Sequence, residues 1–229
     1  MNHLDKKEAQ GLVAEAEEVL ARYVQPELGI ELSQKDYDKT AAKYDQYLGA
    51  LGVTAQRKMA SIVKGLYPDP KQRETLRVID VGAGTGLVGV ELQKIGCRHI
   101  DALEPSRGML DVAKQRGIYT NFFCNFMDDK QLPIDENTYD CMTIVGAMGD
   151  NHIPCCALHE MIRIIKPGGY IINISRAANI KICSDYIERL EPLMEQLEQE
   201  GKWRTINKDV RSDMDFFGTE ALIFVHEVL

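Results

Sequence analysis

The pattern of hydrophobic and polar positions changes once along the chain, near residue 76. Before that point apolar residues recur every three or four positions, which predicts helices over residues 4–24, 36–51 and 53–66. Prolines follow the first and third of these stretches and are expected to end them. The first 35 residues therefore form a helical extension, and residues 36–229 form a single domain of ordinary size.

From residue 76 onward short apolar runs alternate with amphipathic stretches. The pattern predicts strands at 76–81, 99–104, 118–123, 139–147, 170–176, 203–210 and 220–229, and helices at 87–95, 107–116, 157–165 and 180–200. Such alternation is typical of the α/β class with a doubly wound, mostly parallel sheet. Only a turn-rich stretch separates the last two strands, so we expect them to pair antiparallel.

Charge and composition exclude several classes of protein. The formal net charge is −8, and no cluster of Lys and Arg offers a surface for nucleic acid or anionic lipid. No apolar run approaches the roughly 20 residues that span a bilayer. The first 20 residues are charged, unlike a signal peptide, and the six cysteines show neither C-x-x-C nor zinc spacing. We expect a cytoplasmic protein without a bound metal.

A glycine-rich turn, VIDVGAGTGLVG at residues 78–89, follows the first predicted strand. Gly84, Gly86 and Gly89 fit the G-x-G-x-x-G fingerprint of dinucleotide sites, which would indicate an NAD-dependent oxidoreductase. The other template places Asp80 at the strand end before Gly82. A carboxylate there would repel a pyrophosphate but would favour a ligand that carries an ammonium and a sulfonium. Asp80 therefore favours S-adenosylmethionine.

These residues resemble a known family. VIDVGAGTG is similar to the first motif of class I S-adenosylmethionine-dependent methyltransferases, and LEPSRGML, LPIDENTYD and KPGGYIINISR are similar to later ones. The resemblance extends over most of the chain from Tyr37 onward. Within that family YDKTAAKYD, VGAMGDNHIP and the KPGG run resemble the methyltransferase-like protein of the Williams–Beuren syndrome region. The expected cofactor is S-adenosylmethionine, with S-adenosylhomocysteine as product.

The glycine turn and the end of the second strand are expected to hold most of that cofactor. Glu104 has two acceptor oxygens for the two ribose hydroxyls. The resemblance and the strand-end positions together imply a cofactor site made of Tyr37, Tyr44, Asp80, Gly82, Ala83, Gly84, Gly86, Glu104, Pro105, Ser106, Met109, Asn125, Phe126, Val145, Gly146 and Ala147. For Met109 and Phe126, packing in the core is the alternative to contact with the adenine.

Many relatives carry an acid after the third strand that meets the adenine amine, and here the chain departs from that pattern. Asn125 stands in the acid's place, and Asp128 follows three residues later. An amide oxygen can accept from the amine just as a carboxylate does, so both residues remain candidates.

Two side chains near the ends of the fourth and fifth predicted strands are candidates for handling the acceptor. His152 could act as a base, because an unperturbed histidine titrates near neutral pH, or it could be a capping or surface residue. Arg176 could bind a substrate carboxylate with its planar fork, or it could form a surface salt bridge.

Tyr37-Asp38 recurs seven residues later as Tyr44-Asp45, so both pairs project from one helix face. The two tyrosines suit a lid over the cofactor, or they pin the helix to the domain. We expect methyl transfer to a small acceptor, with a protein substrate as the open alternative, by a monomer or weak homodimer. A cofactor-binding protein that acts through partners with little catalysis is the second hypothesis.

Overall fold

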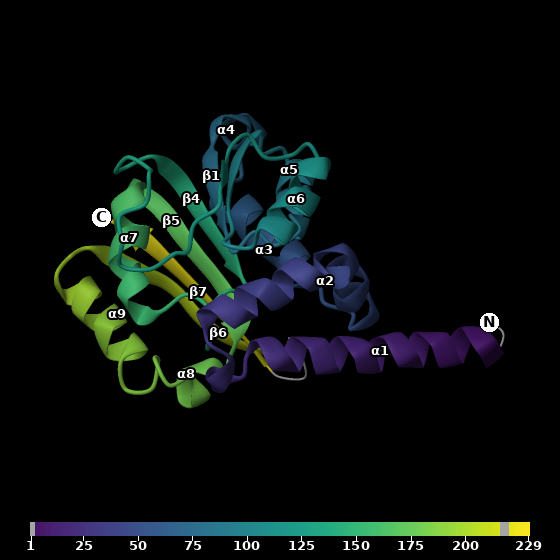
Figure 1. Ribbon diagram of the computed structural model, residues 1–229. Coiled ribbons are helices and arrows are strands. Elements are labelled where there is room, and N and C mark those ends of the chain that lie inside the picture. The colour runs from purple at the N-terminus through teal and green to yellow at the C-terminus, as the bar shows by residue number, and fades with distance from the viewer. Residues whose placement is uncertain (1–2, 216–219) are drawn as a thin grey trace.

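The computed structural model describes residues 3–215 and 220–229. Its centre is a seven-stranded sheet with the order β3-β2-β1-β4-β5-β7-β6 (Figure 1). The strands are β1 (Arg77–Val81), β2 (His99–Leu103), β3 (Phe122–Phe123), β4 (Tyr139–Val145), β5 (Ile165–Arg176), β6 (Trp203–Asp215) and β7 (Glu220–Val228). Strands β1 to β5 pair in parallel, and β7 pairs antiparallel with β5 and with β6. This confirms the expected doubly wound sheet and its antiparallel ending.

Helices cover both faces of the sheet. They are α1 (His3–Tyr23), α2 (Ile30–Ala50), α3 (Ala55–Leu66), α4 (Pro70–Thr75), α5 (Leu87–Lys94), α6 (Arg107–Gln115), α7 (Leu158–Ile164), α8 (Asn179–Ile182) and α9 (Leu190–Gln199), with single turns η1 (Pro26–Leu28) and η2 (Cys155–Ala157). Helices α3, α5 and α6 lie on one face, and α7 to α9 lie on the other (Figure 1). Among the described residues no helix is long and apolar enough to cross a membrane.

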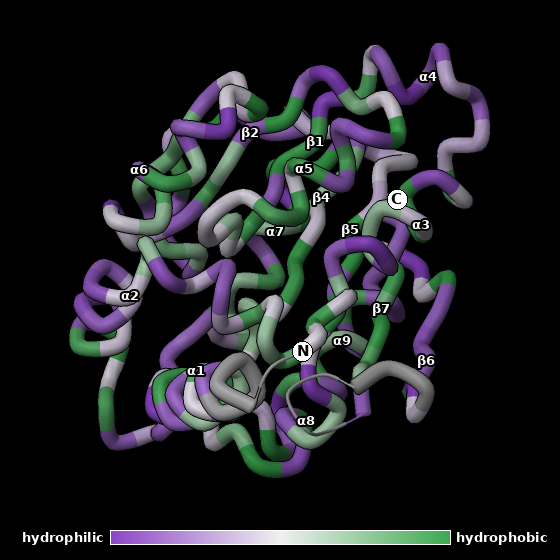
Figure 2. Tube along the Cα trace, turned by 90° about the vertical axis from the view of Figure 1, so that its right-hand side faces the viewer, coloured by the Kyte–Doolittle hydropathy of each residue, from purple (hydrophilic) through white to green (hydrophobic). Residues whose placement is uncertain are grey.

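The hydrophobic core has two halves, one on each face of the sheet. The half beneath α3, α5 and α6 includes Val78 and Ile172, and the half beneath α7 and α9 includes Ile79 and Ile171. Neighbouring residues of one strand thus face opposite halves, as the two-residue period of a strand requires. Figure 2 shows the inner strands β1, β4 and β7 as largely hydrophobic, whereas the outer strand β6 is largely hydrophilic.

Two predicted elements differ from the structure. The helix expected over residues 180–200 is wrong, because the chain forms α8 and α9 with a turn between them. Glu188 in that turn has a φ of 56°, which ends any continuous helix. The carboxylate of Asp185 accepts a hydrogen bond from the backbone N–H of Cys155 at 2.6 Å, so contact with another element holds the turn. The strand expected at 118–123 shortens to β3, because Tyr119 turns inward toward α5.

Helix α2 determines where a ligand can reach the sheet. It begins at Ile30 rather than at residue 36, and it crosses the carboxyl ends of the parallel strands (Figure 1). The strand order reverses between β1 and β4, and open α/β sheets bind ligands at the carboxyl ends beside such a point. The N-terminal helix α1 runs outward from the body of the protein (Figure 1).

Candidate functional site: two chambers beneath α2

A chamber of about 650 Å³, including its open mouth, lies at the carboxyl ends of β1, β2 and β4, and we call it the strand-end chamber. Of the residues expected from the sequence, it is lined by Tyr37, Tyr44, Gly82, Gly84, Glu104, Pro105, Met109, Asn125, Phe126, Val145, Gly146, Ala147 and His152. Asn125 lines the chamber, whereas Asp128 does not.

The lining also includes residues that were not expected from the sequence: Ser33, Gln34, Val81, Leu103, Met127, Asn151 and Ile153. Of these, Val81, Leu103, Asn151 and Ile153 lie within the quoted motifs, whereas the other three lie outside them. Ser33 and Gln34 belong to the segment expected to be a separate extension. Their helical periodicity continues into that of residues 36–51, which is the signal that could have found them.

Glu104 supplies the buried carboxylate of the strand-end chamber. Its two oxygens accept backbone hydrogen bonds from Gly84 at 2.9 Å and from Ser106 at 2.8 Å. The pKa of Glu104 is raised to about 7, mainly by burial and to a smaller extent by the nearby carboxylates of Asp80 and Asp38, while the two backbone hydrogen bonds lower it. Each oxygen keeps a lone pair, so the carboxylate can still accept from two hydroxyl groups.

The glycine turn leaves room for a ligand at one position and for packing at another. Gly84 has a φ of 54°, and a Cβ built on it would meet no atom within 4 Å, so its open side faces the chamber. Gly82 has a φ of 67°, and a Cβ there would lie 2.3 Å from the Cβ of Ala147. Gly82 thus allows the turn to lie close against the end of β4.

Asp80 does not line the chamber, which corrects the expectation that its carboxylate faces the ligand. Tyr119 donates a hydrogen bond to it at 2.6 Å and Thr143 donates another at 2.9 Å. Burial raises the pKa of Asp80 to about 6, although both hydroxyl bonds lower it. The Tyr119 ring in turn packs against Gly86 and Gly89, where no Cβ would fit. Asp80 therefore fixes the base of the turn.

The other expected residues outside the chamber also have structural partners. Ala83 is buried in the core half beneath α3, α5 and α6. The Ser106 hydroxyl accepts from the backbone N–H of Met109 at 3.1 Å and begins α6 as its N-cap. It donates to Asp38 of α2 at 2.6 Å, so it helps to hold that helix over the chamber.

The tyrosines and the aspartates of the repeated Tyr-Asp pair make different contacts. Tyr37 and Tyr44 line the chamber, whereas Asp38 and Asp45 fix α2 to the domain. Asp38 accepts from the backbone N–H of Gly108 at 2.8 Å besides the Ser106 hydroxyl. Asp45 accepts from the Thr85 hydroxyl at 2.5 Å and from the guanidinium of Arg116. Sequence reasoning gave the tyrosines a role but missed both aspartates, whose partners lie 40 or more residues away.

His152 is held in one tautomer. The carbonyl oxygen of Asp150 lies 2.6 Å from Nδ1 and can only accept, so Nδ1 carries the proton. Nε2 then accepts from the hydroxyl of Tyr37 at 2.8 Å. Burial lowers the pKa of His152 and raises that of Tyr37, so both groups are neutral at pH 7. His152 is thus a neutral imidazole whose acceptor nitrogen is occupied by a phenol.

A second cavity, which we call the helix-side chamber, adjoins the first and has a volume of about 1390 Å³ including its open mouth. The two chambers share Tyr37, Tyr44, Val145, Gly146 and His152. Helix α1 contributes one wall through Leu20, Ala21, Tyr23 and neighbours, and Arg176 lines this chamber rather than the first.

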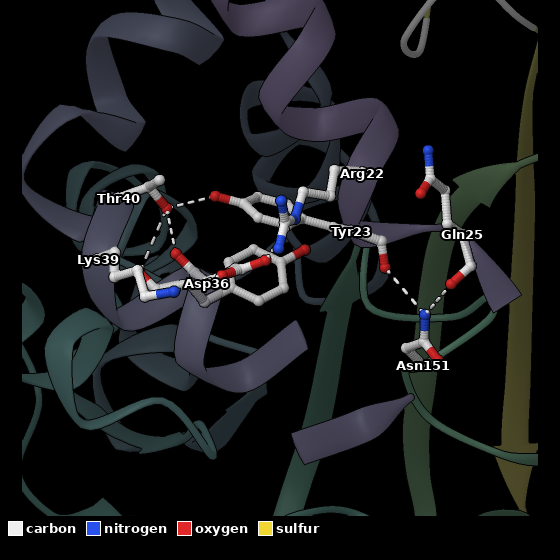
Figure 3. Close-up of polar contacts among 8 residues, drawn as sticks. Arg22, Tyr23, Gln25, Asp36, Lys39, Thr40 and Asn151 are labelled. Atoms are coloured by element: carbon white, nitrogen blue, oxygen red, sulfur yellow. Dashed lines mark hydrogen bonds and ion pairs between the residues drawn. The ribbon is translucent and has the colours of Figure 1, made fainter. Parts of the chain in front are cut away.

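Contacts between α1 and α2 hold the wall of the helix-side chamber in place (Figure 3). Arg22 of α1 pairs with the carboxylate of Asp36 in α2 at 2.6 Å, and Lys39 of α2 pairs with the same carboxylate at 2.9 Å. The hydroxyl of Tyr23 in α1 is hydrogen-bonded to that of Thr40 in α2. From the loop after β4, the amide of Asn151 donates to the carbonyl oxygens of Tyr23 and Gln25 at 3.2 and 2.7 Å. The loop that carries His152 is thereby joined to α1 (Figure 3).

The chain is 35% identical over 175 residues to human methyltransferase-like protein 27, an alignment that covers 76% of this chain and 69% of the human protein. The family described as a methyltransferase domain matches residues 78–169. The chain belongs to the S-adenosylmethionine-dependent methyltransferase family. The resemblance expected from the sequence motifs is thus confirmed, and with it the assignment of this methyltransferase as an enzyme of that class.

More distant relatives place this methyltransferase within the same fold. It is 34% identical over 137 residues to a demethylmenaquinone methyltransferase of Renibacterium salmoninarum, with 59% of this chain and 55% of that protein covered. A SAM-dependent methyltransferase structure from Leishmania major superposes with a TM-score of 0.60 at 20% identity, covering 90% of this chain and 86% of that one. Among the described residues, no group of three or more His, Cys, Asp or Glu could hold a metal ion.

Proposed function

We propose that this protein transfers the methyl group of S-adenosylmethionine, bound in the strand-end chamber, to a small-molecule acceptor in the helix-side chamber. The observation that carries this proposal is the junction between the two chambers. Methyl transfer requires the sulfur, the methyl group and the acceptor atom to lie in line. A donor and an acceptor bound in separate chambers can reach that arrangement only where the chambers open into each other. Tyr37, Tyr44, Val145, Gly146 and His152 surround that opening.

The residues of the strand-end chamber fit the cofactor. The buried Glu104 carboxylate suits the ribose hydroxyls, and the open side of Gly84 admits the methionine part. Met109, Asn125 and Phe126 would hold the adenine, Asn125 as an acceptor for its amine. S-adenosylmethionine supplies an electrophilic methyl group on a sulfonium, and the small residues Gly146 and Ala147 leave room beside it.

The chain's own contribution to transfer is placement and exclusion of water. Tyr37 and Tyr44 form the wall of the chamber on the side of α2, and Asp38 and Asp45 hold that helix against α6 and the glycine turn. His152 in its neutral form can accept a proton only after Tyr37 releases Nε2. A neutral thiol, amine or carbon acceptor that needs no strong base at the junction suits this arrangement.

Several properties support a small acceptor over a polymer. The net charge of −8 disfavours nucleic acid, and the volume of the helix-side chamber lies within the range of small-molecule pockets. The relatives whose names give demethylmenaquinone as acceptor also act on a small molecule. We expect a cytoplasmic monomer or weak homodimer that needs no metal. One observation favours the second function, cofactor binding with little catalysis: both nitrogens of His152 are engaged.

Calorimetric titration of the purified chain with S-adenosylmethionine, S-adenosylhomocysteine and NAD tests the proposal. We expect micromolar binding of the first two and none of NAD. Binding of NAD alone would overturn the cofactor assignment. Tight cofactor binding without S-adenosylhomocysteine release across a broad panel of small acceptors would favour the second function.

A further inference from the structure

The helix-side chamber has an apolar body. Its walls include Leu20, Val24, Leu48, Leu51, Val53 and Met148, besides the rings of Tyr23, Tyr37 and Tyr44. The space in it that water-sized spheres can reach is about 410 Å³, which lies within the size range of pockets for drug-sized ligands. An amino acid or another acceptor of a few atoms would leave most of these apolar walls against water. The chamber therefore suits an acceptor with a sizeable apolar portion.

One half-buried cation, with a buried Nε, lies at the wall of that apolar chamber. Arg176 is the last residue of β5, and its Nε is buried without a hydrogen-bond partner among the described residues. Side chains alternate along a strand, so Arg176 shares its face with Ile172 and Ile174, which pack beneath α3 and α5. A buried guanidinium N–H without a partner is unfavourable, so this group is prepared for an anionic ligand.

The other charges of the helix-side chamber select one class of anion. Among its described lining residues, Glu17 is the other charged group besides Arg176, and it is exposed on α1. A single guanidinium balances one negative charge, and Glu17 at the rim disfavours a second one. A carboxylate matches the planar fork of arginine and carries one charge, whereas a phosphate ester carries nearly two near neutral pH.

The residues shared by the two chambers, which form the junction, carry no charge. Tyr37, Tyr44 and His152 are neutral there, and Val145 and Gly146 are apolar. A cationic amine would have no counter-ion at the point where the methyl group is delivered. The anionic end of the acceptor and its reacting atom must therefore lie at different ends of the molecule.

We propose that the methyl acceptor is an amphipathic monocarboxylate, whose carboxylate binds Arg176 and whose uncharged reacting atom lies at the junction beside Val145 and Gly146. This inference rests on the proposed function, because it places the acceptor relative to a cofactor in the strand-end chamber. It makes α1 part of the acceptor site, since Leu20, Ala21 and Val24 line the chamber that the apolar portion fills.

The test uses 4-phenylbutyrate as a probe, titrated by calorimetry into the full chain saturated with S-adenosylhomocysteine. Matched probes are 4-phenylbutyramide, 4-phenylbutylamine and 4-phenylbutyl phosphate, which keep the apolar portion and change the charge. We expect the carboxylate to bind at least tenfold more tightly than the other three. The Arg176→Gln variant should lose that preference, and Arg176→Lys should keep part of it. Arg57→Gln, at an exposed arginine of α3, is the matched control and should bind as the wild type does.

A second variant guards against loss of folding at Arg176. Ala21→Trp adds bulk from an exposed position on α1, so it should fold, block the chamber and abolish probe binding. The Arg176→Gln and Ala21→Trp variants should both keep the wild-type affinity for S-adenosylmethionine. Equal binding of all four probes, or tighter binding of the phosphate, would overturn the inference while the proposed function stands. Failure of the wild type to bind S-adenosylmethionine would overturn the proposed function itself.

Discussion

The hydroxyl of Tyr37 lies 2.8 Å from Nε2 of His152, and this one contact joins α2 to the loop after β4. The two rings meet edge to face, with centroids 5.8 Å apart. The Tyr37 ring also packs against the Tyr23 ring of α1, tilted by 35°, at a centroid distance of 4.1 Å. Helices α1 and α2 and the distant loop after β4 thus converge on the wall between the two chambers.

The Tyr37→Phe variant should raise the pKa of His152. The phenol of Tyr37 donates a hydrogen bond to Nε2 and so stabilises the neutral imidazole. Burial lowers the pKa of His152 as well. Loss of the phenol removes the first of these two effects, so the pKa should rise. NMR titration of the imidazole Cε1–H signal measures the change, with Tyr44→Phe as a control that leaves this hydrogen bond intact. A lower pKa in Tyr37→Phe would contradict the assigned tautomer.

Affinity for S-adenosylmethionine should rise as the pH increases from about 6 to 8. The pKa of Glu104 is raised to about 7 without ligand, and hydroxyl donors favour its ionised form. Binding therefore lowers this pKa and releases a proton, so affinity increases as the pH passes through 7 and then levels off. Calorimetry in buffers of different ionisation enthalpy counts the protons released.

The Glu104→Gln variant is the control for that pH dependence. Its affinity should be at least tenfold weaker at pH 8 and nearly independent of pH across the same range. A variant that kept the wild-type slope would show that another group carries the linkage.

The Gly84→Ala variant should weaken cofactor binding more than its backbone strain alone explains. At the φ of 54° that Gly84 adopts, a residue with a side chain lowers the folding stability by about 1 kcal/mol. The added methyl group would also enter the strand-end chamber. Gly117→Ala is the matched control, because Gly117 has a φ of 64° and also has no atom within 4 Å. Both variants should lose similar stability in urea unfolding, and only Gly84→Ala should lose affinity.

The Asp80→Ala variant should destabilise the fold by about 1–3 kcal/mol, because it leaves the buried hydroxyls of Tyr119 and Thr143 without an acceptor. Urea unfolding measures this loss. Asp111→Ala removes an exposed carboxylate with a surface ion pair to Lys114 and should cost at most about 0.5 kcal/mol. Equal stability of the two variants would show that Asp80 has no structural role.

The sequence alone determined the sheet, the glycine turn and the cofactor class, because these depend on local features. The alternation of apolar runs sets the strands, and the positions of Gly82, Gly84 and Glu104 at strand ends bring them to one edge. Asp80 indicated the correct family, although the structure gives its carboxylate two hydroxyl partners away from the chamber.

Tertiary structure decided what depends on contacts between distant segments. Nothing in the local pattern shows that Asp38 accepts from the backbone N–H of Gly108 in α6, or that Asp185 accepts from the backbone N–H of Cys155. Nor does it show that the Nε of Arg176 is buried without a partner at the wall of an apolar chamber. Periodicity specifies which face of an element is buried, but not which partner meets it. The helix-side chamber exists only where α1, α2 and β5 come together, so its selectivity could not be predicted from any one of their sequences.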